Sequence, residues 1–211
     1  IFGTHAIFQK KVDYKKLGLI IIDEQHKFGV NQRKKLSDKG GDSCDILLMT
    51  ATPIPRTLTM TIYGDMDLSV IYEKPKNRKP VKTYSKLESK IDEIIKFIRK
   101  EINLGNQIFW VCPLIEESKK LDHASAVKKF DFLKKIFPNE VSLLHGKTNI
   151  NEKEEILNNF LNNKFKILVS TTIIEVGIDF PNANVIIIEN ANKFGLSQLH
   201  QLRGRVGRGE K

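Results

Sequence analysis

Three arginines, at positions 203, 205 and 208, fall within six residues near the end of the chain and alternate with glycines. Most other positive charges are lysines, whereas the planar guanidinium fork binds phosphate oxygens in a bidentate manner. Gly204 and Gly207 would each cost a helix about 1 kcal/mol relative to alanine, which indicates close approach of a backbone or a ligand. If the segment is helical, Arg205 and Arg208 share one face and are expected to reach a nucleotide phosphate. The alternative is a basic, flexible tail that binds nucleic acid loosely.

Two acids follow an apolar run, Leu19–Ile22, which is typical of a buried strand. Ligands of open α/β sheets bind at the carboxyl ends of strands. Asp23 is therefore a candidate Mg²⁺ ligand, and Glu24 a candidate to orient or deprotonate an attacking water. The alternative is a solvated acidic turn, but the longer Asp-Glu-x-His pattern ending at His26 is much narrower.

Hydroxyl-rich loops follow two further apolar runs. Thr50 and Thr52 lie in a loop stiffened by two prolines, which could sense a neighbouring phosphate or could simply be a rigid turn. In the other loop, Gly177 suits close phosphate contact and Asp179 could accept from a ribose hydroxyl or cap a turn.

One apparent phosphate-binding loop is rejected. Residues 145–148 read His-Gly-Lys-Thr, the end of G-x-x-x-x-G-K-[ST], but Val141 stands where the first glycine belongs. The residues before it form an apolar run that predicts a strand. We therefore expect the phosphate loop of a nucleoside triphosphatase to lie upstream of Ile1, and the chain to be a fragment of a longer protein.

The composition is that of an ordinary globular protein of 211 residues, with a formal net charge of +10. This charge favours an acidic partner, nucleic acid first. Cys44 and Cys112 are isolated, which argues against a disulfide framework or a zinc site. No apolar run approaches the length of a membrane span, and no secretory signal is present.

Short apolar runs alternate with helical patterns and predict an α/β fold with parallel strands buried on both faces. The expected strands are 17–22, 46–49, 108–111, 141–144, 167–169 and 185–188. A helix is expected over 91–102, with a capping box at Ser85 and Glu88 and an end before Gly105. A second is expected over 124–137, stopped by Pro138.

A third helix is expected after Asn151, with Glu154 three residues on and with Ile156, Leu157, Phe160 and Leu161 buried. The charged segment around residues 73–80 contains two prolines and no apolar periodicity, which predicts a linker. The expected domains are 1–73, a linker over 74–86, and 87–211, both domains being incomplete α/β units.

Taken together and in order, the motifs resemble those of the superfamily-two helicases, which have two RecA-like parallel-sheet domains, and within them the bacterial RecG family. The resemblance covers nearly the whole chain. It rests on residues 3–6, 23–26 with 28–30, 50–57, 111–118, 173–179 and the arginine–glycine end.

The resemblance implies a role for each matching position. The nucleotide would lie between the two domains and meet Asp23 and Glu24 as Walker B acids, Gly177 and Asp179 near the ribose, and Gln201, Arg205 and Arg208 from the last motif. Arg203 matches no arginine-finger position. His26, Thr50 and Thr52 would couple hydrolysis to motion, and Thr4, His5 and Thr171 would contact DNA.

The implied activity is an ATP- and Mg²⁺-dependent DNA helicase or translocase that acts on branched DNA, such as stalled forks and Holliday junctions, in recombination and repair. It implies binding to DNA without sequence preference, no membrane association, single-strand-binding protein as a candidate partner, and a bacterial cytoplasmic location. The isolated fragment should not hydrolyse ATP, because the family's phosphate loop, wedge domain and final hairpin are absent from it.

Two other readings stay open. The translocase module of a transcription-repair coupling factor shares the motifs at 50–57 and 201–208, although Gln25 and residues 113–118 favour the RecG family. The other is a non-catalytic nucleic-acid-binding module with a helicase-like core. The presence of Asp23, Glu24, Arg205 and Arg208 argues against a core that has lost its catalytic residues.

Overall fold

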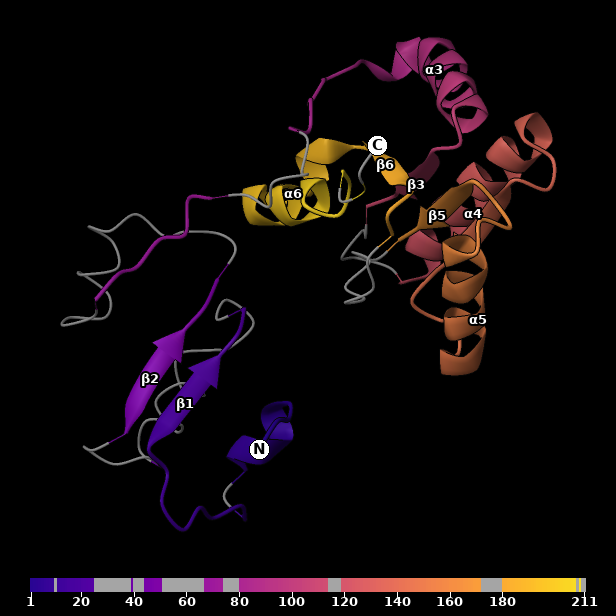
Figure 1. The fold of residues 1–211 in the computed structure, drawn as a ribbon. Coiled ribbons are helices and arrows are strands. Elements are labelled where there is room, and N and C mark those ends of the chain that lie inside the picture. The colour runs from indigo at the N-terminus through magenta and orange to yellow at the C-terminus, as the bar shows by residue number, and fades with distance from the viewer. Residues whose placement is uncertain are drawn as a thin grey trace. The chain divides into compact units, whose positions relative to one another are not determined.

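The structure is a computed structural model that describes residues 1–9, 11–24, 39, 44–50, 67–73, 80–113, 119–171, 180–207 and 209 (Figure 1). The chain divides into two compact units, Ile1–Ser69 and Val70–Lys211. Residues 80–87 have no regular secondary structure, and 74–79 of the predicted linker lie outside the described residues.

The first unit contains a short 3-10 turn, η1 (His5–Phe8), and two parallel strands, β1 (Leu19–Ile22) and β2 (Asp45–Leu48). Ile20 and Ile22 are buried, whereas Leu19 and Ile21 are 55% and 56% exposed. The prediction that this strand is buried on both faces is therefore wrong for the described part of the unit. Alternate side chains point to opposite faces, and the described residues pack against only one of them.

The second unit contains a four-stranded sheet in the order β4-β5-β3-β6, with every pair parallel. The strands are β3 (Gln107–Val111), β4 (Val141–Leu144), β5 (Ile167–Ser170) and β6 (Ala183–Ile188). The two central strands, β3 and β5, are buried along their whole length. The predicted parallel α/β architecture is confirmed, and residues 141–144 form the strand on which rejection of the phosphate loop depended.

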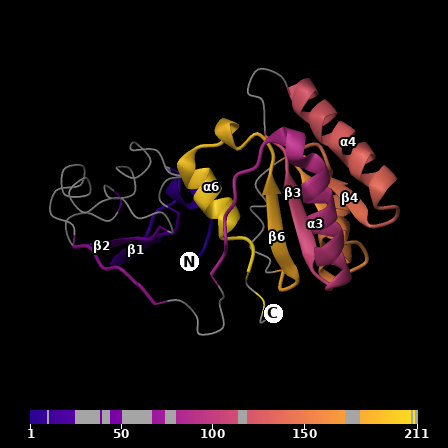
Figure 2. The ribbon, with the colours of Figure 1, turned by 90° about the horizontal axis from the view of Figure 1, so that it is seen from above.

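Helices pack against both faces of this sheet, and Figure 2 shows α3 and α4 beside it. On one face, α3 (Ile91–Asn103) and α4 (Lys119–Ile136) contribute Ile95, Ile98 and Leu133 to a core with Trp110. On the other, α5 (Ile150–Leu161) contributes Leu157 and Phe160 to a second core. The remaining helical elements are η3 (Glu88–Lys90), η4 (Ala191–Lys193) and α6 (Leu196–Arg203).

The start of α3 differs from the prediction. The chain first forms η3 after Leu87, and neither η3 nor α3 has a side-chain cap, so the capping box at Ser85 and Glu88 is wrong. Near this start, Lys90 and Lys86 donate hydrogen bonds to the Glu93 carboxyl, and these bonds hold the pKa of that carboxyl below its usual range. The end of α3 is as expected, because Gly105 takes a φ of +84° just beyond it.

Two other helix boundaries are also corrected. The helix α4 begins at Lys119, five residues before the predicted start. The helix α5 is capped by Asn149, whose side chain accepts from the Glu152 backbone N–H at 2.8 Å, and not by Asn151. Leu161 is 39% exposed and so is not one of the buried residues of α5.

None of the helices in the described ranges is both long and apolar enough to cross a membrane.

Candidate functional site

The two acids of the first unit lie directly beyond β1. Asp23 is exposed and Glu24 is half-buried. The Glu24 backbone has a φ of +51°, and its N–H donates to Asp23 Oδ1 at 2.9 Å. A left-handed backbone is uncommon for a residue with a side chain and turns the chain sharply at the end of the strand. The turn presents the Asp23 carboxylate to solvent at the sheet edge.

Thr50 comes to the same edge. In the parallel pairing Ile22 lies opposite Leu48, and the Met49 N–H donates to the Ile22 carbonyl oxygen at 2.8 Å. The residues that follow the two strands, Asp23–Glu24 and Thr50, therefore leave the sheet side by side. The structure brings together the acids and the first hydroxyl of the proposed coupling loop.

Thr4 precedes η1 and is exposed, and its carbonyl oxygen accepts from the Ile7 N–H at 3.1 Å. Thr171 follows β5 in the second unit and is only 4% exposed. Its N–H donates to the Leu144 carbonyl oxygen at 3.4 Å, so it lies at the carboxyl edge of the sheet.

The rejected phosphate loop forms a tight turn at this edge, after β4. The Thr148 N–H donates to the His145 carbonyl oxygen at 3.0 Å, and the His145 N–H donates to Thr148 Oγ1 at 3.2 Å. These bonds close the turn on itself and lead directly into the α5 cap.

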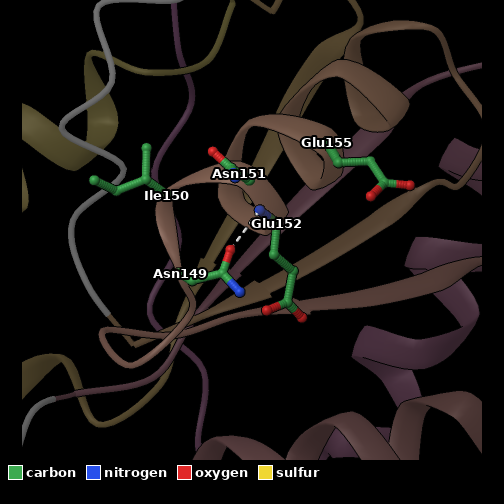
Figure 3. A pocket seen from close by; sticks show the side chains of 5 residues that line it. All are labelled: Asn149, Ile150, Asn151, Glu152 and Glu155. Atoms are coloured by element: carbon green, nitrogen blue, oxygen red, sulfur yellow. Dashed lines mark hydrogen bonds between the residues drawn. The ribbon is translucent and has the colours of Figure 1, made fainter.

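An open hollow of about 600 Å³ lies at the start of α5 and is lined by Asn149, Ile150, Asn151, Glu152 and Glu155 (Figure 3). The side chain of Asn149 is occupied with capping, and Glu152 and Glu155 supply negative charge. Such a lining suits the positive end of a helix and disfavours phosphate. The hollow is thus not suited to a nucleotide.

A partly buried polar network that the sequence did not reveal lies at the carboxyl ends of β3 and β6. Glu189 Oε1 accepts from Lys129 Nζ of α4 at 2.6 Å. Glu189 Oε2 accepts from Trp110 Nε1 and from Cys112 Sγ, each at 3.4 Å. Lys129 Nζ also lies 5.1 Å from the centre of the Trp110 ring. The network joins α4 to the point where the chain leaves β6 for α6.

The Cys112 thiol is part of this network and is almost fully buried. Burial raises its pKa well above the usual range, and the nearby Glu189 carboxylate raises it further. The thiol is therefore protonated at neutral pH, which makes it a hydrogen-bond donor and a poor nucleophile. Both cysteines are free thiols.

The arginine segment, residues 204–209, follows α6. The helix ends at Arg203, so the condition for a shared helical face of Arg205 and Arg208 is not met. Arg205 is half-buried, and its N–H donates to the Leu202 carbonyl oxygen at 3.0 Å in the turn after the helix. Gln201 lies in the last turn of α6 and is half-buried.

The segment is fixed to the sheet by the residues after Arg205. Val206 is 1% exposed and belongs to the core that includes Phe180 and Ala183. The Gly207 N–H donates to the Ala183 carbonyl oxygen at 3.3 Å. Paired glycines were the sequence signal for a close approach, but the partner strand could not be inferred.

Several predicted site residues lie outside the described residues, namely His26, Thr52, Gly177, Asp179 and Arg208. His5 belongs to η1, and its side chain is outside the description. Within the described ranges, no three His, Cys, Asp or Glu side chains gather as a metal-binding group. An exposed Asp23 nevertheless fits Mg²⁺, which keeps several waters and needs only one or two carboxylates.

Residues 89–210, more than half of the chain, match the family described as the helicase conserved C-terminal domain. The chain is 52% identical to the ATP-dependent DNA helicase RecG of Bacillus subtilis (strain 168), over 100% of this chain and 31% of that protein. It is 51% identical to the protein of the same name from Thermotoga maritima, over 99% of this chain and 27% of that protein. The chain thus spans about a third or less of the length of these relatives.

The fold is also similar to solved structures. A structure of RecG bound to a three-way DNA junction superposes with a TM-score of 0.68 at 46% identity, over 98% of this chain and 26% of that one. Saccharomyces cerevisiae Dbp5, bound to RNA and ADP BeF3, superposes with a TM-score of 0.65 at 19% identity, over 98% of this chain and 55% of that one. The second likeness concerns the RecA-like fold alone.

Proposed function

Because the chain belongs to the helicase conserved C-terminal domain family, we propose that it is part of an ATP-dependent DNA helicase or translocase that acts on branched DNA in recombination and repair. The observation that carries this proposal is identity of about half of all residues, along the whole chain, to proteins named RecG. One solved relative is bound to a three-way DNA junction, which supports forks and junctions as the substrate class.

The acids of the first unit supply the hydrolytic chemistry in this proposal. Asp23 would hold Mg²⁺ from the exposed end of β1, and the ion would neutralise phosphate charge when bound. Glu24 orients or deprotonates the attacking water. Its half-buried position and the sharp turn at its backbone support a carboxylate held in one orientation.

The second unit supplies positive charge to the same nucleotide. Arg205 and Arg208 stabilise charge on the γ-phosphate, with Gln201 beside them, while Gly177 and Asp179 contact the phosphates and the ribose. Arginine is suited to this task because its fork is always charged and matches phosphate oxygens. The buried Val206, next to Arg205, supports an arginine held on a fixed backbone.

Coupling and DNA contact are assigned to the loops at the sheet edges. We propose that His26, Thr50 and Thr52 couple hydrolysis to motion, and the position of Thr50 beside the acids supports this role. Thr4, His5 and Thr171 would contact the DNA backbone. The net charge of +10 suits phosphate contacts without base reading, as a translocase requires.

The proposed domains are residues 1–73 and 87–211, joined by a linker over 74–86. We place the full protein in the bacterial cytoplasm, away from membranes, with single-strand-binding protein as a candidate partner. The bacterial sources of the relatives support this assignment.

The test is the ATPase rate of the full-length gene product with forked DNA, linear duplex and single strands at one salt concentration. Stronger stimulation by forks than by duplex is the expected result. Equal stimulation by plain duplex would instead favour a translocase of the transcription-repair coupling type. Absence of hydrolysis with every DNA would favour a non-catalytic nucleic-acid-binding module.

A further inference from the structure

The arginine segment runs against the backbone that leads into β6. Val206 packs in one core with Phe180 and Ala183, and the Gly207 N–H donates to the Ala183 carbonyl oxygen at 3.3 Å. Gly209 lies against Pro181, the residue that follows Phe180. Residues 206, 207 and 209 therefore all contact the four-residue stretch 180–183.

Neither glycine is easily replaced, Gly207 because of its backbone conformation and Gly209 because of its packing. Gly207 has a φ of +69°, a conformation that glycine adopts readily and that other residues disfavour. At Gly209, an added Cβ would clash with the carbonyl oxygen of Pro181 and lie 3.0 Å from its carbonyl carbon. Both of these are backbone atoms, which cannot rotate away as a side chain would.

From this packing we infer that Gly207 and Gly209 are positioning residues for the arginine pair, with the backbone of residues 181–183 as their fixed support. Arg205 is held between the end of α6 and the buried Val206. Arg208 stands between the two glycines in the sequence. The inference rests on the proposed function, in which both arginines act on the nucleotide.

The same support adjoins a second part of the proposed site. Residues 180–183 directly follow the segment that contains Gly177 and Asp179. One short stretch of backbone thus connects the residues assigned to the ribose with the residues assigned to the γ-phosphate. A displacement at Gly209 is expected to alter the arginines first, because Gly209 belongs to the arginine segment whereas residues 180–183 do not.

The test is Gly209→Ala in the full-length protein. Because the arginines act mainly in the transition state, kcat should fall about tenfold or more while KM for ATP changes less than about threefold. Affinity for ADP with aluminium fluoride, a transition-state mimic, should fall about tenfold or more, whereas affinity for ADP alone should change little. The matched control is Gly18→Ala, since a Cβ there meets nothing within 4 Å.

A second pair of variants guards against a simple folding defect. Asparagine tolerates a left-handed backbone better than alanine does. Gly207→Asn should therefore retain more of the wild-type kcat than Gly207→Ala, and both variants should be fully folded at the assay temperature before ligand is added. If the variants at Gly207 and at Gly209 all lose kcat, ADP affinity and melting temperature together, the inference is overturned, because the two glycines then have a structural role only.

Arg208→Ala separates this inference from the proposed function. If Arg208→Ala leaves kcat unchanged, the assignment of the arginine itself is wrong. If Arg208→Ala abolishes turnover while Gly209→Ala keeps the wild-type kcat and analogue affinity, the positioning role is wrong and the proposed function stands.

Discussion

Lys129 Nζ lies 2.6 Å from Glu189 Oε1, and their side chains are only 18% and 21% exposed. This ion pair joins α4 to the end of β6 in the second unit. Since a lysine left without its carboxylate in a mostly buried position is costly, Glu189→Gln should destabilise the unit by about 1–3 kcal/mol.

The measurement is urea denaturation followed by fluorescence of Trp110, the single tryptophan of the chain, which is buried in this unit. Glu93→Gln is the control, because Glu93 pairs with Lys86 and Lys90 on the surface with 49% of its side chain exposed. That change should cost clearly less, because solvent screens an exposed pair. Equal losses in the two variants would refute the claim that the Lys129–Glu189 pair stabilises the unit more than the surface pairs of Glu93 do.

The Cys112 thiol predicts a pH dependence of stability. Its folded-state pKa is raised, so the folded state retains the proton at pH values where the unfolded chain loses it. Stability is therefore full below the unfolded pKa of about 8.5 and falls above it, by about 1.4 kcal/mol per pH unit for this one group.

Comparison of the free energy of unfolding between pH 7.5 and 10 in wild type and Cys112→Ser isolates this contribution, since the other groups titrate in both. The free energy of unfolding of wild type minus that of Cys112→Ser should fall as pH rises. A parallel profile in wild type and Cys112→Ser would show that the buried thiol does not govern this decline.

The cap of α5 gives a prediction in which two neighbouring asparagines should behave differently. Asn149 accepts from the Glu152 N–H, so Asn149→Ala should cost about 1 kcal/mol. Asn151 lies inside the helix and is exposed, so Asn151→Ala should be neutral or slightly stabilising because alanine is the better helix former. Urea denaturation of both variants checks this, and the reverse order would place the helix start at Asn151.

The strands of the second unit could be predicted from sequence because their apolar runs are unbroken and their neighbours bury both faces. Helix starts were less certain for a physical reason visible at α5. Asn149 and Asn151 are each followed three residues later by a glutamate, so the local pattern fits two starts. The tertiary position of the turn after β4 decides between them.

The long-range contacts of the second unit are beyond sequence reasoning because they join distant parts of the chain. Glu189 meets Trp110 and Cys112 across 79 and 77 residues. Gly207 indicated a close approach, but only the fold shows that its partner is Ala183 and that Gly209 lies against Pro181. Local patterns identify residue types suited to a task, while the register of the strands decides which of them meet.

The most direct test of the central claim is single-turnover ATP hydrolysis by the full-length protein on forked DNA, with Arg205→Ala, Arg208→Ala and Arg203→Ala compared. If the first two arginines stabilise the transferred phosphoryl group, each loss should slow hydrolysis by about 10³–10⁵. Arg203 is exposed on α6, so Arg203→Ala should slow hydrolysis by less than about threefold. Equal rates in the three variants would contradict the account, because the segment would then act only as a basic surface.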